Sequence, residues 1–164
     1  MKNLMLYLIV IIGFILQSTI LQFVQIDGVV INLILVMLVV ISLQTNELYG
    51  GTLGLMLGIL CDIYYSPYFG INSLIFMSIG FILGSISDNV YKFDFLTNLY
   101  FTIIGTLYFH GIYYIINFFL KLEPSSIFFM MKIIIIEMIL NILILFPIIK
   151  FERFVFRRFK IKFE

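Results

Sequence analysis

Apolar residues fill the chain in six long runs that are separated by short polar breaks. The runs are continuous and do not alternate with polar residues, so they favour helices and exclude a membrane β-barrel. A helix of about 20 residues crosses the roughly 30 Å hydrocarbon core of a bilayer. We therefore predict an all-α integral membrane protein with six transmembrane helices, over residues 4–24, 29–43, 48–65, 71–86, 95–120 and 127–149.

Polar and turn-forming residues mark the boundaries between these runs. The breaks lie at residues 25–28, 44–47, 66–67, 87–94 and 121–126. Lys2 precedes the first run, as in a signal peptide, but no cleavage site of small residues follows it. We expect this segment to remain as a membrane anchor, with residues 1–150 forming one six-helix bundle.

The composition agrees with a membrane location. Hydrophobic residues make up 63% of the 164 positions and charged residues 12%, and the mean hydropathy is +1.18. Soluble domains carry about 25% charged residues, so this chain has too little charge to cover a surface in water. Almost nothing outside the bilayer is therefore expected.

Positive charge is distributed unevenly between the two sides that a six-span topology defines. Lys and Arg concentrate in the cytoplasmic loops of membrane proteins. With the N-terminus inside, only Lys121 and Lys132 lie outside. The eight basic residues on the cytoplasmic side are Lys2, Lys92, Lys150, Arg153, Arg157, Arg158, Lys160 and Lys162. We therefore expect both termini to be cytoplasmic.

Residues 151–164 form a basic amphipathic cytoplasmic tail in this interpretation. Apolar residues recur every four positions from 151 to 163, and basic residues follow another side of the same helix. A helix of this kind rests on an anionic inner leaflet. The residues that we expect to contact anionic lipids are Arg153, Arg157, Arg158 and Lys160. Alternatively, the tail only sets the orientation of the chain or docks a cytoplasmic partner.

Glycines recur at four-residue spacing in the third and fourth runs. Such G-x-x-x-G units let helix backbones approach closely in lipid, where no hydrophobic force drives helices together. We predict that the third and fourth helices form a tightly packed pair, and we weigh a dimer face as the alternative. The predicted packing residues are Gly50, Gly51, Gly54, Gly58, Gly80 and Gly84.

Asp62 follows the last of the third run's glycines by four residues, on the same helical face. A carboxylate near the outer end of a span is costly, so it should cap a helix, form a pair or bind a ligand. Gly70 and Asn72 lie just beyond the following turn. We predict a polar knot of Asp62, Gly70 and Asn72 near the outer face, with proton or ligand handling as the alternative.

Glu137 lies in the middle of the sixth run, with Asn141 one turn further on. A carboxylate in the middle of a membrane is expensive unless it is paired or faces the inside of a bundle. His110 and Asn117 in the fifth run are the predicted partners across the helix interface. A ligand pocket or a proton relay formed by the same residues is the alternative.

Several function classes find no support in the sequence. No Ser-His-Asp set, phosphate-binding glycine loop or metal-ligand spacing occurs, so we expect no catalytic residues, no cofactor and no metal. The single cysteine, Cys61, lies in an apolar run and has no partner for an intrachain disulfide. A net charge of +1 gives no indication of nucleic-acid binding.

The glycine-rich centre resembles the signature of the MreD family. The resemblance is carried by residues 50–62 (GGTLGLMLGILCD), residues 70–74 (GINSL) and residues 80–84 (GFILG). The run Gln17-Ser18-Thr19 in the first span is also typical of that family, as is the chain length. The family often has Pro-Asp at the start of the second span, where this chain has Ile31-Asn32.

This resemblance implies a non-enzymatic scaffold in the bacterial plasma membrane. MreD-like proteins act with MreC, a single-span protein with a large outer domain, and connect MreB filaments to the enzymes that elongate peptidoglycan. The family is also similar in architecture to the substrate-binding components of energy-coupling-factor transporters. A small-molecule binding component of such a transporter is therefore the alternative function, although the chain contains no alanine for an Ala-x-x-x-Ala docking stripe.

Overall fold

The computed structural model describes residues 2–66, 68–119 and 127–159 and contains six α-helices, which confirms the predicted number. Each apolar run contains one of them. In chain order the elements are α1 (Lys2–Thr19), the 3₁₀ turn η1 (Leu21–Phe23), β1 (Gln25–Ile26), β2 (Val29–Val30), α2 (Leu33–Ser42), α3 (Glu47–Tyr65), α4 (Ile71–Ser85), the 3₁₀ turn η2 (Ser87–Asn89), α5 (Phe95–Phe119) and α6 (Ile127–Arg158).

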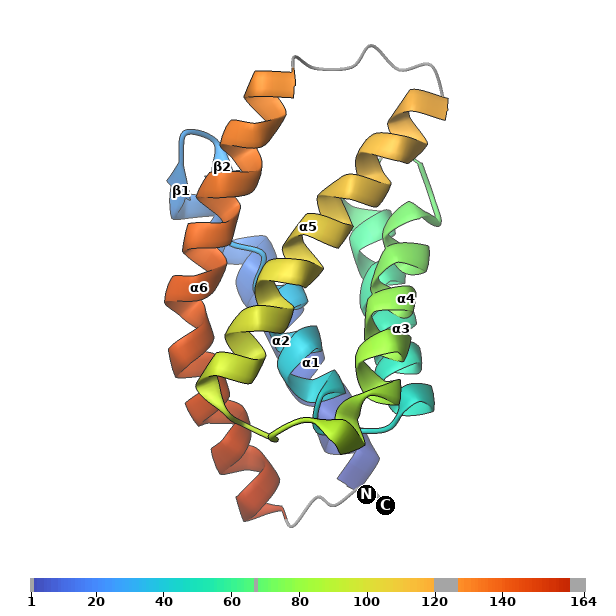
Figure 1. Ribbon diagram of the computed structural model, residues 1–164, viewed down its shortest axis with the longest axis vertical. Coiled ribbons are helices and arrows are strands. Elements are labelled where there is room, and N and C mark those ends of the chain that lie inside the picture. The colour runs from blue at the N-terminus through green and yellow to red at the C-terminus, as the bar shows by residue number, and fades with distance from the viewer. Residues whose placement is uncertain (1, 67, 120–126, 160–164) are drawn as a thin grey trace.

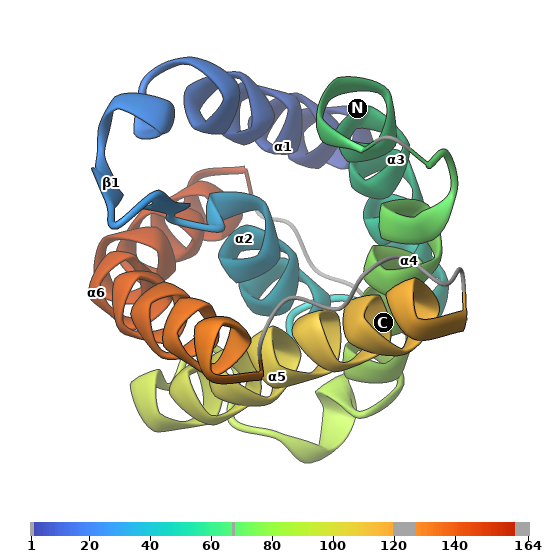
Figure 2. The same ribbon diagram turned by 90° about the horizontal axis from the view of Figure 1, so that it is seen from above.

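The helix α2 lies at the centre of the bundle, and the other five helices surround it (Figure 2). All ten of its residues are buried. Apart from one serine, these residues are Leu, Ile, Val and Met, so every side of the helix can pack against an apolar neighbour. A helix that is apolar all round is the kind that a bundle encloses completely.

The second predicted span, residues 29–43, is wrong in its extent. Its first two residues are β2, the second strand of the short antiparallel hairpin β1–β2. The helix α2 itself is only about 15 Å long, half the thickness of the hydrocarbon core. Asp27 and Gly28 form the turn with positive φ angles of 51° and 79°. An Asp-Gly pair between apolar residues is a strong hairpin signal that the hydropathy pattern hides.

Four of the helices are long and apolar enough to cross a membrane, over Leu6–Phe23, Glu47–Tyr65, Phe95–Phe119 and Phe128–Arg158. The other two, α2 and α4, are shorter. Large apolar side chains cover the outside of the long helices; for example Ile12 is 54% exposed, Ile63 69% and Leu143 68%. Such an exterior suits contact with lipid chains.

The last helix continues beyond residue 150, where the tail was predicted to begin. It runs from Ile127 to Arg158 and contains Pro147. Its last turns pack against the bundle, because Glu152, Val155 and Phe156 are buried. Neither carboxylate oxygen of Glu152 has a hydrogen-bond partner among the described residues. The end of α6 and the start of α1 lie at the same end of the molecule (Figure 1).

Candidate functional site

The carboxylate of Asp62, in the last turn of α3, holds the start of α4. It accepts hydrogen bonds from the backbone N–H groups of Gly70 (3.0 Å), Asn72 (2.9 Å) and Ser73 (3.0 Å). The side chains of Asn72 (3.1 Å) and Ser73 also donate to it. Asp62 is 2% exposed, so these five hydrogen bonds replace the water that an ionised carboxylate would otherwise bind.

This arrangement supplies a helix cap that α4 lacks. The residue at its N-cap position is Gly70, which has no side chain to accept from the first turn, and no acidic residue lies in that turn. The first N–H groups of a helix have no partner within the helix, and the helix dipole favours a negative charge beside them. Asp62 therefore serves as the capping residue of a neighbouring helix and joins α3 firmly to α4.

The helices α3 and α4 run side by side (Figures 1 and 2). They make their closest backbone contacts at the glycines. Gly50 and Gly80 face each other so closely that a methyl group on either would overlap the carbonyl of the other. A methyl group at Gly54 would overlap the carbonyl of Phe76. These positions allow backbone-to-backbone contact that a larger residue would prevent.

The remaining predicted glycines differ in their surroundings. Gly58 lies against the backbone of Asn72 and Ser73, and Gly84 lies against the backbone of residues 46–47. Gly51 instead faces the ring and Cβ of Phe81, where an added Cβ would be in ordinary contact at 3.5 Å. Five of the six glycines thus contact neighbouring backbone, and Gly51 alone among those six has room for a methyl group.

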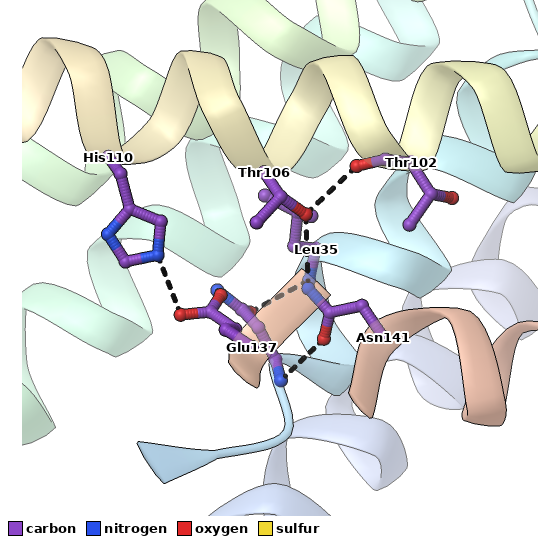
Figure 3. A network of polar contacts seen from close by, with 7 residues as sticks. Leu35, Thr102, Thr106, His110, Glu137 and Asn141 are labelled. Carbon is purple, nitrogen blue, oxygen red and sulfur yellow. Dashed lines mark hydrogen bonds and ion pairs between the residues drawn. The ribbon is translucent and has the colours of Figure 1, made fainter. Parts of the chain in front are cut away.

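A second polar centre lies where α2 begins. The carboxylate of Glu137 in α6 accepts from the side-chain amide of Asn32 at 3.1 Å and contacts Nε2 of His110 in α5 at 2.7 Å. Figure 3 shows Glu137 between His110 and the start of α2. The centre therefore connects three helices, and Glu137 is only 7% exposed.

Asn141, one turn along α6, extends this centre in two directions. Its side-chain oxygen accepts from the backbone N–H of Asn32 at 3.0 Å, and its amide donates to Oγ1 of Thr106 at 3.1 Å (Figure 3). The oxygen of Asn32 caps α2 by accepting from the N–H of Leu35 at 3.1 Å. Asn32 and Thr106 were not predicted as members, although polar residues every four positions along α5 were visible in the sequence.

The first helix also contributes to the start of α2. The side-chain oxygen of Gln17 accepts from the backbone N–H of Ile34 at 2.9 Å. Gln17 belongs to the Gln-Ser-Thr run noted in the sequence, but its partner lies on another helix and has no local signal. The N-terminus of α2 is thus held by side chains of α1 and α6, and α5 supports the centre through His110 and Thr106.

Asn117 lies apart from the centre to which it was assigned. It is two turns beyond His110, and no hydrogen bond of its side chain is found within the described part of the chain. The helices α5 and α6 diverge toward this end (Figure 1). An open, mostly apolar pocket of about 190 Å³ lies between them, lined in part by Gly111, Tyr114 and Met130. The two helices are therefore further apart at the last turns of α5 than at its middle.

The basic residues predicted to contact lipids lie in different surroundings. The guanidinium of Arg153 is half-buried and donates to the carbonyl of Phe93, just before α5. Arg157 and Arg158 are exposed at the end of α6. Lys160 lies outside the described residues. Of the three described arginines, only Arg153 forms a side-chain hydrogen bond that joins it to the bundle.

Neither polar centre groups the side chains that a metal site needs within the described part of the chain. Among residues 2–66, 68–119 and 127–159, no group of three or more His, Cys, Asp or Glu side chains could hold a metal ion. Each carboxylate oxygen of Asp62 and Glu137 already has a protein partner. What both centres do chemically is fix one helix end to another inside the bundle.

Replacing Glu137 by leucine is expected to destabilise the bundle by about 2 kcal/mol. It would leave the amide of Asn32 and the ring nitrogen of His110 without a partner, at roughly 1 kcal/mol or more each. Glu137→Gln keeps an oxygen for Asn32 and is expected to cost less than about 1 kcal/mol. Unfolding in detergent with increasing dodecyl sulfate measures both variants. Equal stability of the two would contradict this role for Glu137.

A comparison with protein families gives a match over most of the chain. The family model described as rod shape-determining protein MreD matches residues 1–155 of the 164-residue chain. This range includes both polar centres and the glycine-packed pair of helices. Neither the curated proteins nor the solved structures that were searched give a match.

Proposed function

Because the chain belongs to the MreD family of rod shape-determining proteins, we propose that it is a non-catalytic membrane scaffold of the machinery that elongates rod-shaped bacteria. Family membership indicates a role in determining rod shape. The family match and the four helices long enough to cross a membrane both indicate a multi-pass membrane protein. The observation that carries the proposal is the family match, which extends over nearly the whole chain.

We place both ends of the chain in the cytoplasm. The start of α1 and the end of α6 lie at one end of the bundle (Figure 1). That end also carries Lys92, Lys150 and the arginines of α6, whereas Lys132 pairs with Asp27 of the β1–β2 hairpin at 3.0 Å, toward the other end. An excess of basic residues at the cytoplasmic side favours this orientation.

The proposed partner is an MreC-like single-span membrane protein. Through it the chain would be linked to MreB filaments and to the peptidoglycan elongation enzymes. The intramembrane carboxylates of Asp62 and Glu137 are bonded inside the bundle, and the exterior of the long helices is apolar. A partner that meets this exterior within the bilayer therefore has to be an apolar helix, since a polar surface there would be left unsatisfied.

The alternative function, a substrate-binding component of an energy-coupling-factor transporter, receives no support from the family match. A ligand site needs several polar groups that converge on a cavity. The side chains of the two polar centres converge on one another instead. The chain resembles those transporter components only in its number of helices among the described residues.

Isolation of the tagged chain from its native membrane in a mild detergent tests the proposed partner. We expect a single-span protein with a large outer domain to co-purify in near-stoichiometric amount. Recovery of a pair of ATPases with a coupling membrane subunit would instead support the transporter function. Gly54→Ala, which perturbs the α3–α4 contact, should reduce recovery of the partner, and Gly51→Ala is the matched control that should not.

A further inference from the structure

An open pocket of about 770 Å³ lies between the connection from α4 to α5 and one face of α6. The connection contributes residues 91–94, α5 contributes its first two residues, and α6 contributes four residues spaced along one side. The lining of the pocket includes the basic side chains Lys92, Lys150 and Arg153. The segments that line it lie toward the end of the bundle where α1 begins and α6 ends (Figure 1).

The positive charge in this pocket is poorly compensated. Asp94 is the acidic residue of the lining, and its carboxylate is occupied in capping α5. The backbone N–H of Thr97 donates to it at 2.9 Å and lowers the pKa of Asp94. Three positive charges thus face one negative charge. No described carboxylate forms an ion pair with Lys150 or Arg153, which instead lie near the aromatic rings of Phe146 and Phe93.

The remaining basic residue has only a weak partner. Lys92 contacts Asp88 at 3.8 Å, but the side chain of Asp88 is 94% exposed. Exposed pairs at this distance contribute little, so Lys92 can turn toward another anion at small cost. Lys92 and Lys150 are therefore free to bind a negatively charged group that enters the pocket. Arg153 donates from one nitrogen to the carbonyl of Phe93 and keeps its other N–H groups for such a ligand.

An apolar surface continues from the pocket toward the middle of the bundle. Phe95 and Phe146 meet edge to face at its border, with ring centroids 6.3 Å apart. Beyond them, exposed apolar side chains follow α5 and α6, among them Leu96, Tyr100, Ile139 and Leu143. A ligand that fits both parts has an anionic head and an apolar chain that lies along the helices.

We propose that this pocket binds the headgroup of an anionic phospholipid of the inner leaflet, with its phosphate among Lys92, Lys150 and Arg153. Basic pockets between membrane helices at the cytoplasmic side recognise such headgroups. The acyl chains lie on the apolar faces of α5 and α6. The bound lipid fills the space between the α4–α5 connection and α6 and joins them, as Arg153 does through the carbonyl of Phe93. The site is independent of the proposed protein partner.

Native mass spectrometry of the purified chain with added dioleoylphosphatidylglycerol tests the proposal. In Lys92→Gln/Lys150→Gln we expect the dissociation constant of the first bound lipid to rise about 30-fold, from the contribution of two lysines near an anionic group. The matched control is Arg157→Gln/Arg158→Gln, which removes the same charge at the same end of the molecule but outside the pocket. The sequence predicts that these two arginines contact the surface of the leaflet as a whole, and a single headgroup bound in the pocket does not need that contact. The dissociation constant of the control variant should change by less than about twofold.

The conservative variant Lys92→Arg/Lys150→Arg should bind the lipid as the native chain does, which shows that the pocket tolerates replacement of both lysines. Dioleoylphosphatidylcholine, which carries no net charge, should not compete. An equal rise of the dissociation constant in the two glutamine variants would contradict the proposed pocket. It would indicate instead that the lipid is attracted by the positive charge of this end of the molecule as a whole. Unchanged binding in Lys92→Gln/Lys150→Gln, or displacement of the lipid by millimolar inorganic phosphate, would also overturn the proposed pocket.

Discussion

A methyl group at Gly54 is expected to separate α3 from α4 and to lower the free energy of unfolding by about 3 kcal/mol. The added carbon would overlap the backbone carbonyl of Phe76, which cannot rotate away as a flexible side chain can. Overfilling a well-packed contact costs about 1–3 kcal/mol, and a contact between backbones lies at the upper end of that range. Unfolding of the purified Gly54→Ala variant in detergent measures the loss.

Gly51 provides a control three residues earlier on the same helix. An alanine there would be in ordinary contact with Phe81 at 3.5 Å, so no backbone has to move. Replacing glycine by alanine within a helix gains about 1 kcal/mol, so Gly51→Ala should be as stable as the native chain or slightly more stable. The two variants are thus expected to change stability in opposite directions. Similar behaviour of both would show that the glycines do not determine the packing of α3 on α4.

Asp62→Asn is expected to lower the free energy of unfolding by about 3 kcal/mol and to expose the first amides of α4 to exchange. One carboxylate oxygen becomes an NH₂ group that faces N–H donors, and the negative charge at the helix end is lost. Hydrogen bonds to a charged group contribute about 1.5–3 kcal/mol each, and at least one would be broken and others weakened. Hydrogen exchange at Gly70, Asn72 and Ser73 reads out the cap directly.

Asp88→Asn is the matched control for this substitution. Asp88 lies in η2 with its side chain 94% exposed, and its contact with Lys92 is long at 3.8 Å. The same chemical change there should alter stability by less than about 0.5 kcal/mol. If Asp62→Asn leaves both stability and amide exchange as they are in Asp88→Asn, the charge of Asp62 does not hold α4.

The arrangement of α3 and α4 follows closely from local patterns in the sequence. Glycines four residues apart mark helix faces that can approach closely, and the structure brings five of the six predicted glycines against backbone. Asp62 lies four residues after Gly58, so the same face carries it to the start of α4. Only a short turn connects the two helices, which limits how they can be placed relative to each other.

The structure around α2 could not be predicted from local patterns in the sequence. Residues 29–43 form one apolar run, and hydropathy alone does not distinguish a span from a hairpin followed by a buried half-length helix. The bond between Asn32 and Glu137 joins residues 105 positions apart, so no spacing in the sequence indicates it. Asn117 shares a helical face with His110, but the divergence of α5 from α6 is a property of the packed bundle.

The proposal that the chain acts within the plane of the bilayer is tested most directly by reducing its partner to a membrane helix. The tagged chain is isolated together with an MreC-like partner that retains its single span and lacks its outer domain. We predict that this short form is recovered as well as the full-length partner, because the contact is between helices. Loss of the short form, with the full-length partner still recovered, would place the contact outside the membrane and contradict the proposal.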